Sequence, residues 1–83
     1  MKFVAEIEVM PLKEILDPQG KAVKLGLGNL GINDINDVRI GKHIRLELEA
    51  INKEEADKNV ELACKKLLAN QIMEGYKYSI TEI

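Results

Sequence analysis

Apolar and charged residues alternate along the first ten positions of the chain. The apolar side carries Phe3, Ala5, Ile7 and Val9, and the charged side carries Lys2, Glu6 and Glu8, with Val4 as the exception. A period of two is typical of a strand with one buried face. The pattern therefore predicts a strand over residues 2–10 that ends at Pro11.

The apolar period lengthens to that of a helix over residues 18–30, where Ala22, Val23, Leu27 and Leu30 share one side. The stretch "LDPQG" precedes it: Asp17 can cap the helix, and Pro18 suits the first helical position. Gly20 costs about 0.5–1 kcal/mol in a first turn, which indicates either that the helix starts raggedly or that another group comes close to the turn. Gly31 is the predicted C-terminal cap.

Residues 35–50 predict two strands joined by a short loop. A three-residue loop at Gly41-Lys42-His43 would pair Ile40 with Ile44 and Val38 with Leu46, which places all the apolar side chains on one face. Gly41 would supply a positive φ.

The stretch "INKEEADKNVELACKKLLAN", residues 51–70, contains the clearest predicted helix. Asn52 can cap it, Glu55 can complete a capping box and Asn70 suits a left-handed end. The expected apolar stripe comprises Ala56, Val60, Ala63, Cys64, Leu67 and Leu68. A last strand over residues 76–82 would place Tyr76, Tyr78 and Ile80 on one face.

The resulting order, β-α-β-β-α-β, predicts an α+β fold of the ferredoxin-like type. It would have a four-stranded antiparallel sheet with two helices on one face. At 83 residues, the chain has room for a single domain spanning 1–83. A chain this short buries only about 60–65% of its unfolded surface, and many such domains gain burial by oligomerising.

Composition excludes several classes of partner. The net charge is −2 with acids and bases interspersed, which argues against the concentrated basic surface that binds nucleic acid. No apolar run approaches the length of a membrane span. A single cysteine cannot form an internal disulfide, so a reducing, cytoplasmic setting is expected.

Reactive chemistry is sparse. His43, the only histidine, falls in a predicted turn, where a solvated side chain is the ordinary finding. Cys64 lies on an apolar stripe and is expected to act as a small hydrophobe. The run "GLGNLG" at 26–31 ends a helix, whereas a phosphate loop begins one. No metal-ligand spacing is present. The aromatics of an RNA-recognition sheet, the paired cysteines of a copper chaperone and the loop arginine of an acylphosphatase are also missing.

The pieces "LDPQGKAV" at 16–23, "LG" at 30–31, "DVRIGKHIRLELEA" at 37–50 and "CKKLLAN" at 64–70 are collinear. Together they resemble the small PurS-type subunit of phosphoribosylformylglycinamidine (FGAM) synthase. The chain departs from the family at Lys13-Glu14, where the family has Pro-Gly, and at Gln71, where it has proline.

The resemblance implies a non-catalytic subunit without cofactor or metal of its own. It would form dimers or tetramers and join a glutaminase subunit to a large synthetase subunit that uses ATP, Mg and glutamine. Asp17, Pro18, Gln19, Gly20 and Lys21 would be exposed and would contact a partner. The alternative is a small regulatory ligand-binding domain of the same element order, which calorimetry with amino acids and nucleotides would distinguish.

Overall fold

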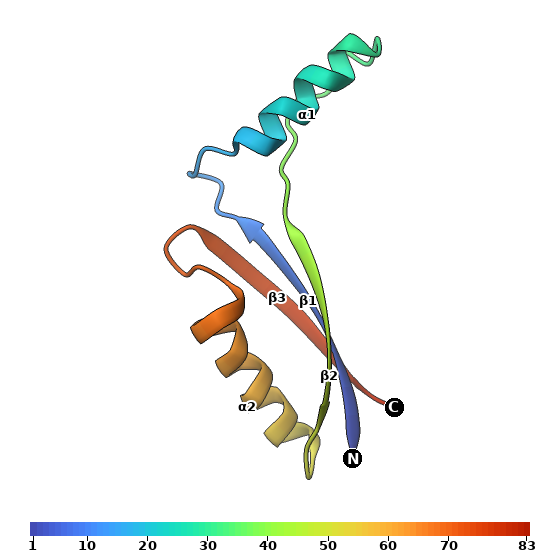
Figure 1. The fold of residues 1–83 in the computed structure, drawn as a ribbon, viewed down its shortest axis with the longest axis vertical. Helices are drawn as coiled ribbons and strands as arrows, with labels where there is room; N and C mark the ends of the chain where they lie inside the picture. The colour runs from blue at the N-terminus through green and yellow to red at the C-terminus, as the bar shows by residue number, and fades with distance from the viewer.

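The computed structural model describes residues 1–83, which form a three-stranded antiparallel sheet and two helices (Figure 1). The sheet has the order β2-β1-β3, with β1 at Lys2–Pro11, β2 at Lys42–Glu49 and β3 at Glu74–Glu82. The helices are α1 at Pro18–Asn29 and α2 at Lys53–Ala63, and α2 continues as the π turn η1 at Cys64–Leu68. Because β1 is central, β2 and β3 are both edge strands.

The expected four-stranded ferredoxin-like sheet is wrong, because residues 35–41 form no strand. In the observed register, Ile44 lies opposite Ile7 and Leu46 lies opposite Ala5, both on β1. The pairing of Ile44 and Leu46 with Ile40 and Val38 is therefore also wrong.

Two of the expected left-handed residues do not occur. Gly31 at the end of α1 has φ +87 and is the only residue with positive φ, so Gly41 and Asn70 lack the conformation predicted for them. Gly41 has a different role. A Cβ there would lie 2.4 Å from the carbonyl oxygen of Val9, so the close passage of β1 requires glycine.

The helix α1 extends away from the sheet, so the expectation of two helices on one face is wrong as well (Figure 1). Its cap is as predicted: Gly31 donates to the Gly28 carbonyl and Ile32 donates to the Leu27 carbonyl, as in a Schellman motif. Its apolar side chains remain largely in solvent; Leu25 is 71% exposed and Leu30 77%.

The protomer is consequently extended. Its radius of gyration is 16.4 Å, whereas a compact chain of this length has about 12 Å. Its accessible surface is 6206 Å², against about 5,000 Å² for a compact monomer of this mass. The protomer alone exposes surface that compact proteins of its size bury.

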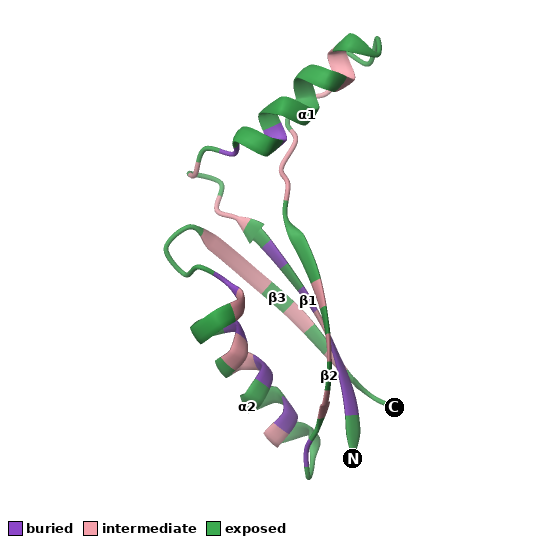
Figure 2. Ribbon diagram, in the orientation of Figure 1, coloured by how far each residue is buried: buried purple, intermediate pink, exposed green.

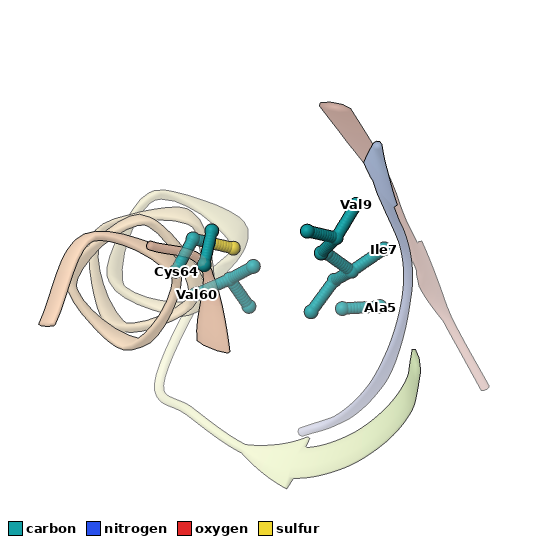
Figure 3. Close-up of a cluster of buried hydrophobic side chains, with 6 residues drawn as sticks. Ala5, Ile7, Val9, Val60 and Cys64 are labelled. Atoms are coloured by element: carbon teal, nitrogen blue, oxygen red, sulfur yellow. The ribbon is translucent and has the colours of Figure 1, made fainter. Parts of the chain in front are cut away.

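The core lies between β1 and α2 (Figure 2). Figure 3 shows Ala5, Ile7 and Val9 of β1 pointing toward Val60 and Cys64 of the helix. The alternation predicted for the first strand is thus confirmed. A smaller cluster of Phe3, Ala50 and Ala56 closes the far end of the sheet.

The second helix begins as predicted but ends differently. The Asn52 side chain accepts a hydrogen bond from the backbone N–H of Glu55 at 2.8 Å. At the other end, Ala69 donates to the Cys64 carbonyl, five residues back, which is the π pattern. This wider turn leaves Leu67 81% exposed and buries Ala69, so Leu67 was wrongly placed in the apolar stripe.

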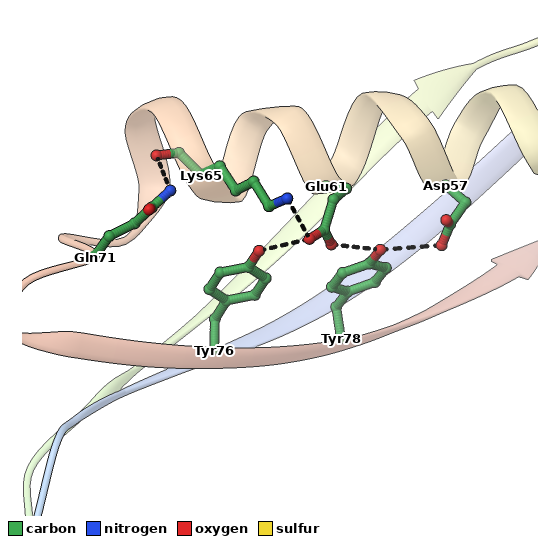
Figure 4. Close-up of polar contacts among 6 residues, drawn as sticks. All are labelled: Asp57, Glu61, Lys65, Gln71, Tyr76 and Tyr78. Atoms are coloured by element: carbon green, nitrogen blue, oxygen red, sulfur yellow. Dashed lines mark hydrogen bonds and ion pairs between the residues drawn. The ribbon is translucent and has the colours of Figure 1, made fainter.

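A polar cluster joins α2 to the edge strand β3 (Figure 4). The hydroxyls of Tyr76 and Tyr78 donate to the Glu61 carboxylate at 2.7 and 2.9 Å, and Tyr78 also reaches Asp57 at 3.0 Å. Hydrogen bonds from Tyr76 and then Tyr78 lower the pKa of Glu61. The hydrogen bond to Glu61 raises the pKa of Tyr76 to about 12. At physiological pH the Glu61 carboxylate is therefore ionised, and the phenols of Tyr76 and Tyr78 are neutral.

The burial of Cys64 generates a stability prediction. The thiol is fully enclosed, and burial raises its pKa. Cys64→Ala should lower the free energy of unfolding by about 1 kcal/mol, because a small apolar group leaves the core. Urea unfolding measures this change. In the same solutions, a thiol reagent should label the native protein far more slowly than the unfolded one; rapid native labelling would contradict the packing.

Candidate partner-binding site

The turn that precedes α1 is organised by one carboxylate. Asp17 accepts the backbone N–H of Gly20 at 2.9 Å on Oδ1 and that of Ile40 at 2.8 Å on Oδ2. Asp17 therefore caps the helix, as predicted, and also anchors a segment more than twenty residues further along the chain.

These bonds change the acidity of Asp17. The pKa of its carboxyl lies below the usual value, mainly because the backbone N–H groups of Gly20 and then Ile40 donate hydrogen bonds to the carboxylate. A lowered folded-state pKa means that ionised Asp17 stabilises the fold above the ordinary carboxyl pKa of about 3.9. That stabilisation is lost as the pH falls through the lower folded-state value.

The surroundings of Gly20 explain why a glycine occupies the first turn of α1. A Cβ at this position would lie 2.1 Å from the carbonyl oxygen of Val38 and 2.8 Å from Asp17 Oδ2. The group that comes close to the turn is therefore the backbone of the same chain. Pro18 begins the helix with its fixed φ, so the whole "DPQG" turn is rigid.

Arg39 strengthens the crossing, which is the place where residues 38–40 pass over the start of α1. Its guanidinium donates to the carbonyl oxygens of Leu12 and Ile15 in the loop after β1, with a distance of 3.1 Å to Ile15. Asp17 and Arg39 thus hold residues 38–40 against the 12–17 loop. The sequence pattern could not reveal this pairing, because the alternation around Arg39 predicts a strand and does not show which other segment its side chain contacts.

The five residues predicted to contact a partner divide into two groups. Pro18, Gln19 and Lys21 are exposed, as expected. Asp17 is only 8% exposed and Gly20 is buried, so their expected exposure is wrong; both are enclosed by residues 38–40. Contact between this turn and a partner stays a prediction, and the free side chains at the surface are those of Pro18, Gln19 and Lys21.

A shallow hollow of about 280 Å³ lies beside this turn. Its lining includes Ile15, Leu16 and Asp17, which precede α1, and Met73, which lies in the turn before β3. Leu16 is 65% exposed and Met73 47%. Sequence reasoning missed this apolar rim, because its residues lie in loops and follow no period. Exposed apolar side chains around a hollow suit a protein partner.

Other chemistry does not gather around the turn. The imidazole Nε2 of His43 contacts the carboxylate of Glu6 on the sheet face opposite α2. No group of three or more His, Cys, Asp or Glu side chains is arranged to hold a metal ion. No helix has both the length and the apolar character that a membrane crossing requires.

Two glycines of α1 provide a matched test of the turn. Gly20→Ala should lower the free energy of unfolding by about 2 kcal/mol, because the new methyl group meets the Val38 carbonyl. Gly26→Ala should raise it by about 0.5–1 kcal/mol, because no atom lies near that position and alanine favours a helix. Urea unfolding compares the two variants. Equal effects would rule out the crossing at Gly20.

Comparison with known proteins gives one consistent answer. The family model "PurS: Phosphoribosylformylglycinamidine (FGAM) synthase" matches residues 4–82. The phosphoribosylformylglycinamidine synthase subunit PurS of Bacillus subtilis is 44% identical over 81 residues, which cover 98% of this chain and 95% of that protein. A crystal structure of B. subtilis PurS superposes with a TM-score of 0.87 at 38% identity, covering 96% of this chain and 99% of that one.

A second solved structure, that of PurLQS from Thermotoga maritima, contains a similar chain. It superposes with a TM-score of 0.83 at 34% identity and covers 100% of this chain and 99% of the matched one. Agreement between sequence and structure extends over nearly the full length in each comparison. The chain belongs to the PurS family of phosphoribosylformylglycinamidine synthase.

Proposed function

We propose that this chain is the accessory PurS subunit of FGAM synthase in purine biosynthesis and that it bridges the glutaminase and ATP-dependent synthetase subunits. Membership of the PurS family makes it a subunit of this glutamine-dependent ligase without a catalytic role of its own. The observation that carries the bridging role is the full-length match to a chain in the PurLQS structure.

The bridging role is physical. Glutamine hydrolysis on one subunit releases ammonia, which has to reach the synthetase before it is lost to solvent. A subunit that fixes the two partners relative to one another supports this transfer by proximity and by exclusion of water. Such a role requires rigid surfaces, and the turn held by Asp17 and Arg39 supplies one.

The subunit binds no cofactor in this proposal. ATP, Mg and glutamine act on the partner subunits, and the complex functions in the cytoplasm. The interspersed charges and the net charge of −2 support protein partners over nucleic acid.

Self-association is the second part of the proposal. The extended protomer exposes about 1,200 Å² more surface than a compact monomer of its mass. A stable interface needs about 800 Å² from each partner, so this excess is enough for a dimer. The exposed apolar side chains of α1 also support self-association; Leu25 is 71% exposed and Leu30, at the helix end, is 77% exposed.

Light scattering tests self-association directly. The isolated protein at micromolar concentration should elute from gel filtration with the mass of a dimer or a tetramer. A single species of 9.3 kDa, the protomer mass, would refute this part of the proposal.

Reconstitution from purified subunits tests the bridging role. Glutamine-dependent FGAM synthesis should require this chain, whereas the synthetase should still use free ammonia at high concentration without it. Unchanged glutamine-dependent turnover after omission of this chain would remove the bridging role and favour a regulatory ligand-binding domain.

Surface variants refine the same assay. Gln19→Ala and Lys21→Glu should weaken assembly about tenfold, or about 1.4 kcal/mol, without loss of the fold, because both side chains are exposed. Lys58→Glu on α2 is the matched control: it reverses an exposed charge on the other helix and should leave assembly unchanged.

A further inference from the structure

We propose that the α1 hollow, which lies between α1 and the returning chain at residues 32–35, binds an acidic segment of a partner subunit. A carboxylate of that segment pairs with Lys21 and Lys24, and an apolar side chain beside the carboxylate packs against the rest of the lining. The inference rests on the proposed function and names the chemistry of one surface through which this chain holds a partner.

The α1 hollow has a volume of about 380 Å³ and is open to solvent. Side chains of α1 line one side of it, and the chain that returns from the helix lines the other (Figure 1). Two hydrogen bonds hold these sides together. The Lys24 ammonium donates to the Asn36 carbonyl at 3.0 Å, and the Ile32 N–H donates to the Leu27 carbonyl at 3.0 Å. The hollow is therefore formed before a partner arrives, which lowers the cost of binding.

The lining of the α1 hollow carries positive charge and no acid. Lys21 and Lys24 are the only charged residues of α1, although the whole chain has a net charge of −2. Neither lysine forms an ion pair within the protomer, and Asp34 and Asp37 of the following segment do not line the hollow. A lysine in the first turn does not favour the helix itself, because the N-terminal end of a helix dipole is positive. Both cations are therefore available to a carboxylate from outside the protomer.

Apolar side chains line the α1 hollow beside the lysines. They belong to Leu25 of the helix and to Ile32 and Ile35 of the returning chain. Leu25 is 71% exposed and Ile32 47%. A small inorganic anion would pair with the lysines but would leave this apolar surface in water. A peptide segment with an acid beside an apolar residue pairs with the cations and also buries the apolar surface, which is the composition of a protein interface.

Gly28 leaves space in the α1 hollow for an incoming chain. Unlike Gly20, it has no steric reason for being glycine within the protomer. Its φ is not positive, and a Cβ there would meet only Asn33 Oδ1, at an ordinary contact distance of 3.7 Å. Glycine inside a helix is nevertheless less favourable than alanine. The missing side chain at Gly28 therefore suits the close approach of a second polypeptide.

Filling the α1 hollow tests its role. Gly28→Leu should weaken binding to the purified glutaminase and synthetase subunits about tenfold in isothermal titration calorimetry, because the new side chain takes the place of the incoming segment. Gly26→Leu is the matched control. It adds the same side chain to the same helix outside the hollow and should leave binding unchanged. Leucine favours a helix more than glycine does, so both variants should keep the fold, which circular dichroism checks.

The two lysines test the chemistry of the occupant. The double variant Lys21→Gln with Lys24→Gln should weaken the same binding about tenfold and make it less dependent on salt concentration, because salt screens the lost charges. Lys58→Glu on α2 should change neither quantity. In the wild-type complex, a carbodiimide, which joins carboxylates directly to amines, should link Lys21 or Lys24 to an aspartate or glutamate of a partner subunit. Mass spectrometry of the digested complex identifies the linked residues.

The outcomes separate this inference from the proposed function. If Gly28→Leu binds as tightly as the wild type, or if Gly26→Leu weakens binding equally, the α1 hollow is not the binding site. Carbodiimide links from these lysines to a second copy, or a changed mass of the isolated Gly28→Leu chain in light scattering, would assign the hollow to self-association and overturn the proposal. Reconstitution measures separately whether glutamine-dependent synthesis needs this chain, so the bridging role stands or fails independently of the hollow.

Discussion

The carboxylate of Asp17 is the contact on which the shape of this protein depends. It receives one N–H from the first turn of α1 and another from Ile40, so a single side chain fixes two segments that are distant in sequence. Since Gly20 has no side chain, the Val38 carbonyl can reach the helix at this point. Residues 38–40 therefore lie across the helix start instead of joining the sheet, and the sheet keeps three strands.

This crossing also explains why α1 extends away from the sheet. The chain leaves β1, turns into the helix and returns past the Asp17 turn before β2 begins beside β1 (Figure 1). The helix is thus held at its base by polar contacts, and most of its apolar side chains remain in solvent. A small core between β1 and α2, with partly buried side chains of β2 and β3 packed against it, carries the fold (Figure 2).

The features that can be predicted from the sequence are those that depend on the local hydrophobic period and on helix capping. The alternation of Phe3, Ala5, Ile7 and Val9, the cap at Asn52 and the left-handed Gly31 all follow from short-range rules, and the structure confirms them. The fourth strand fails because Val38 and Ile40 have strand-like alternation, while their backbone is bound by Asp17 and blocked by the helix start. Period alone carries no information on which partner a segment finds. The same limit applies to the site: the "LDPQG" stretch left open a ragged helix start or a close approach at Gly20, and the resemblance assigned that approach to a partner. The backbone of residues 38–40 in the same chain makes it.

The extended form of the protomer suits a subunit that connects other proteins. A compact domain of this size would bury its apolar side chains and leave a small convex surface for partners. Here the turn at Pro18, Gln19 and Lys21 and the free edge of β2 lie on different parts of one narrow molecule, 51 × 27 × 14 Å in extent. The two surfaces are therefore exposed at the same time and do not overlap. In a chain with so little reactive chemistry, the Asp17 turn fixes how the start of α1 lies relative to residues 38–40 and so to the strand that follows them.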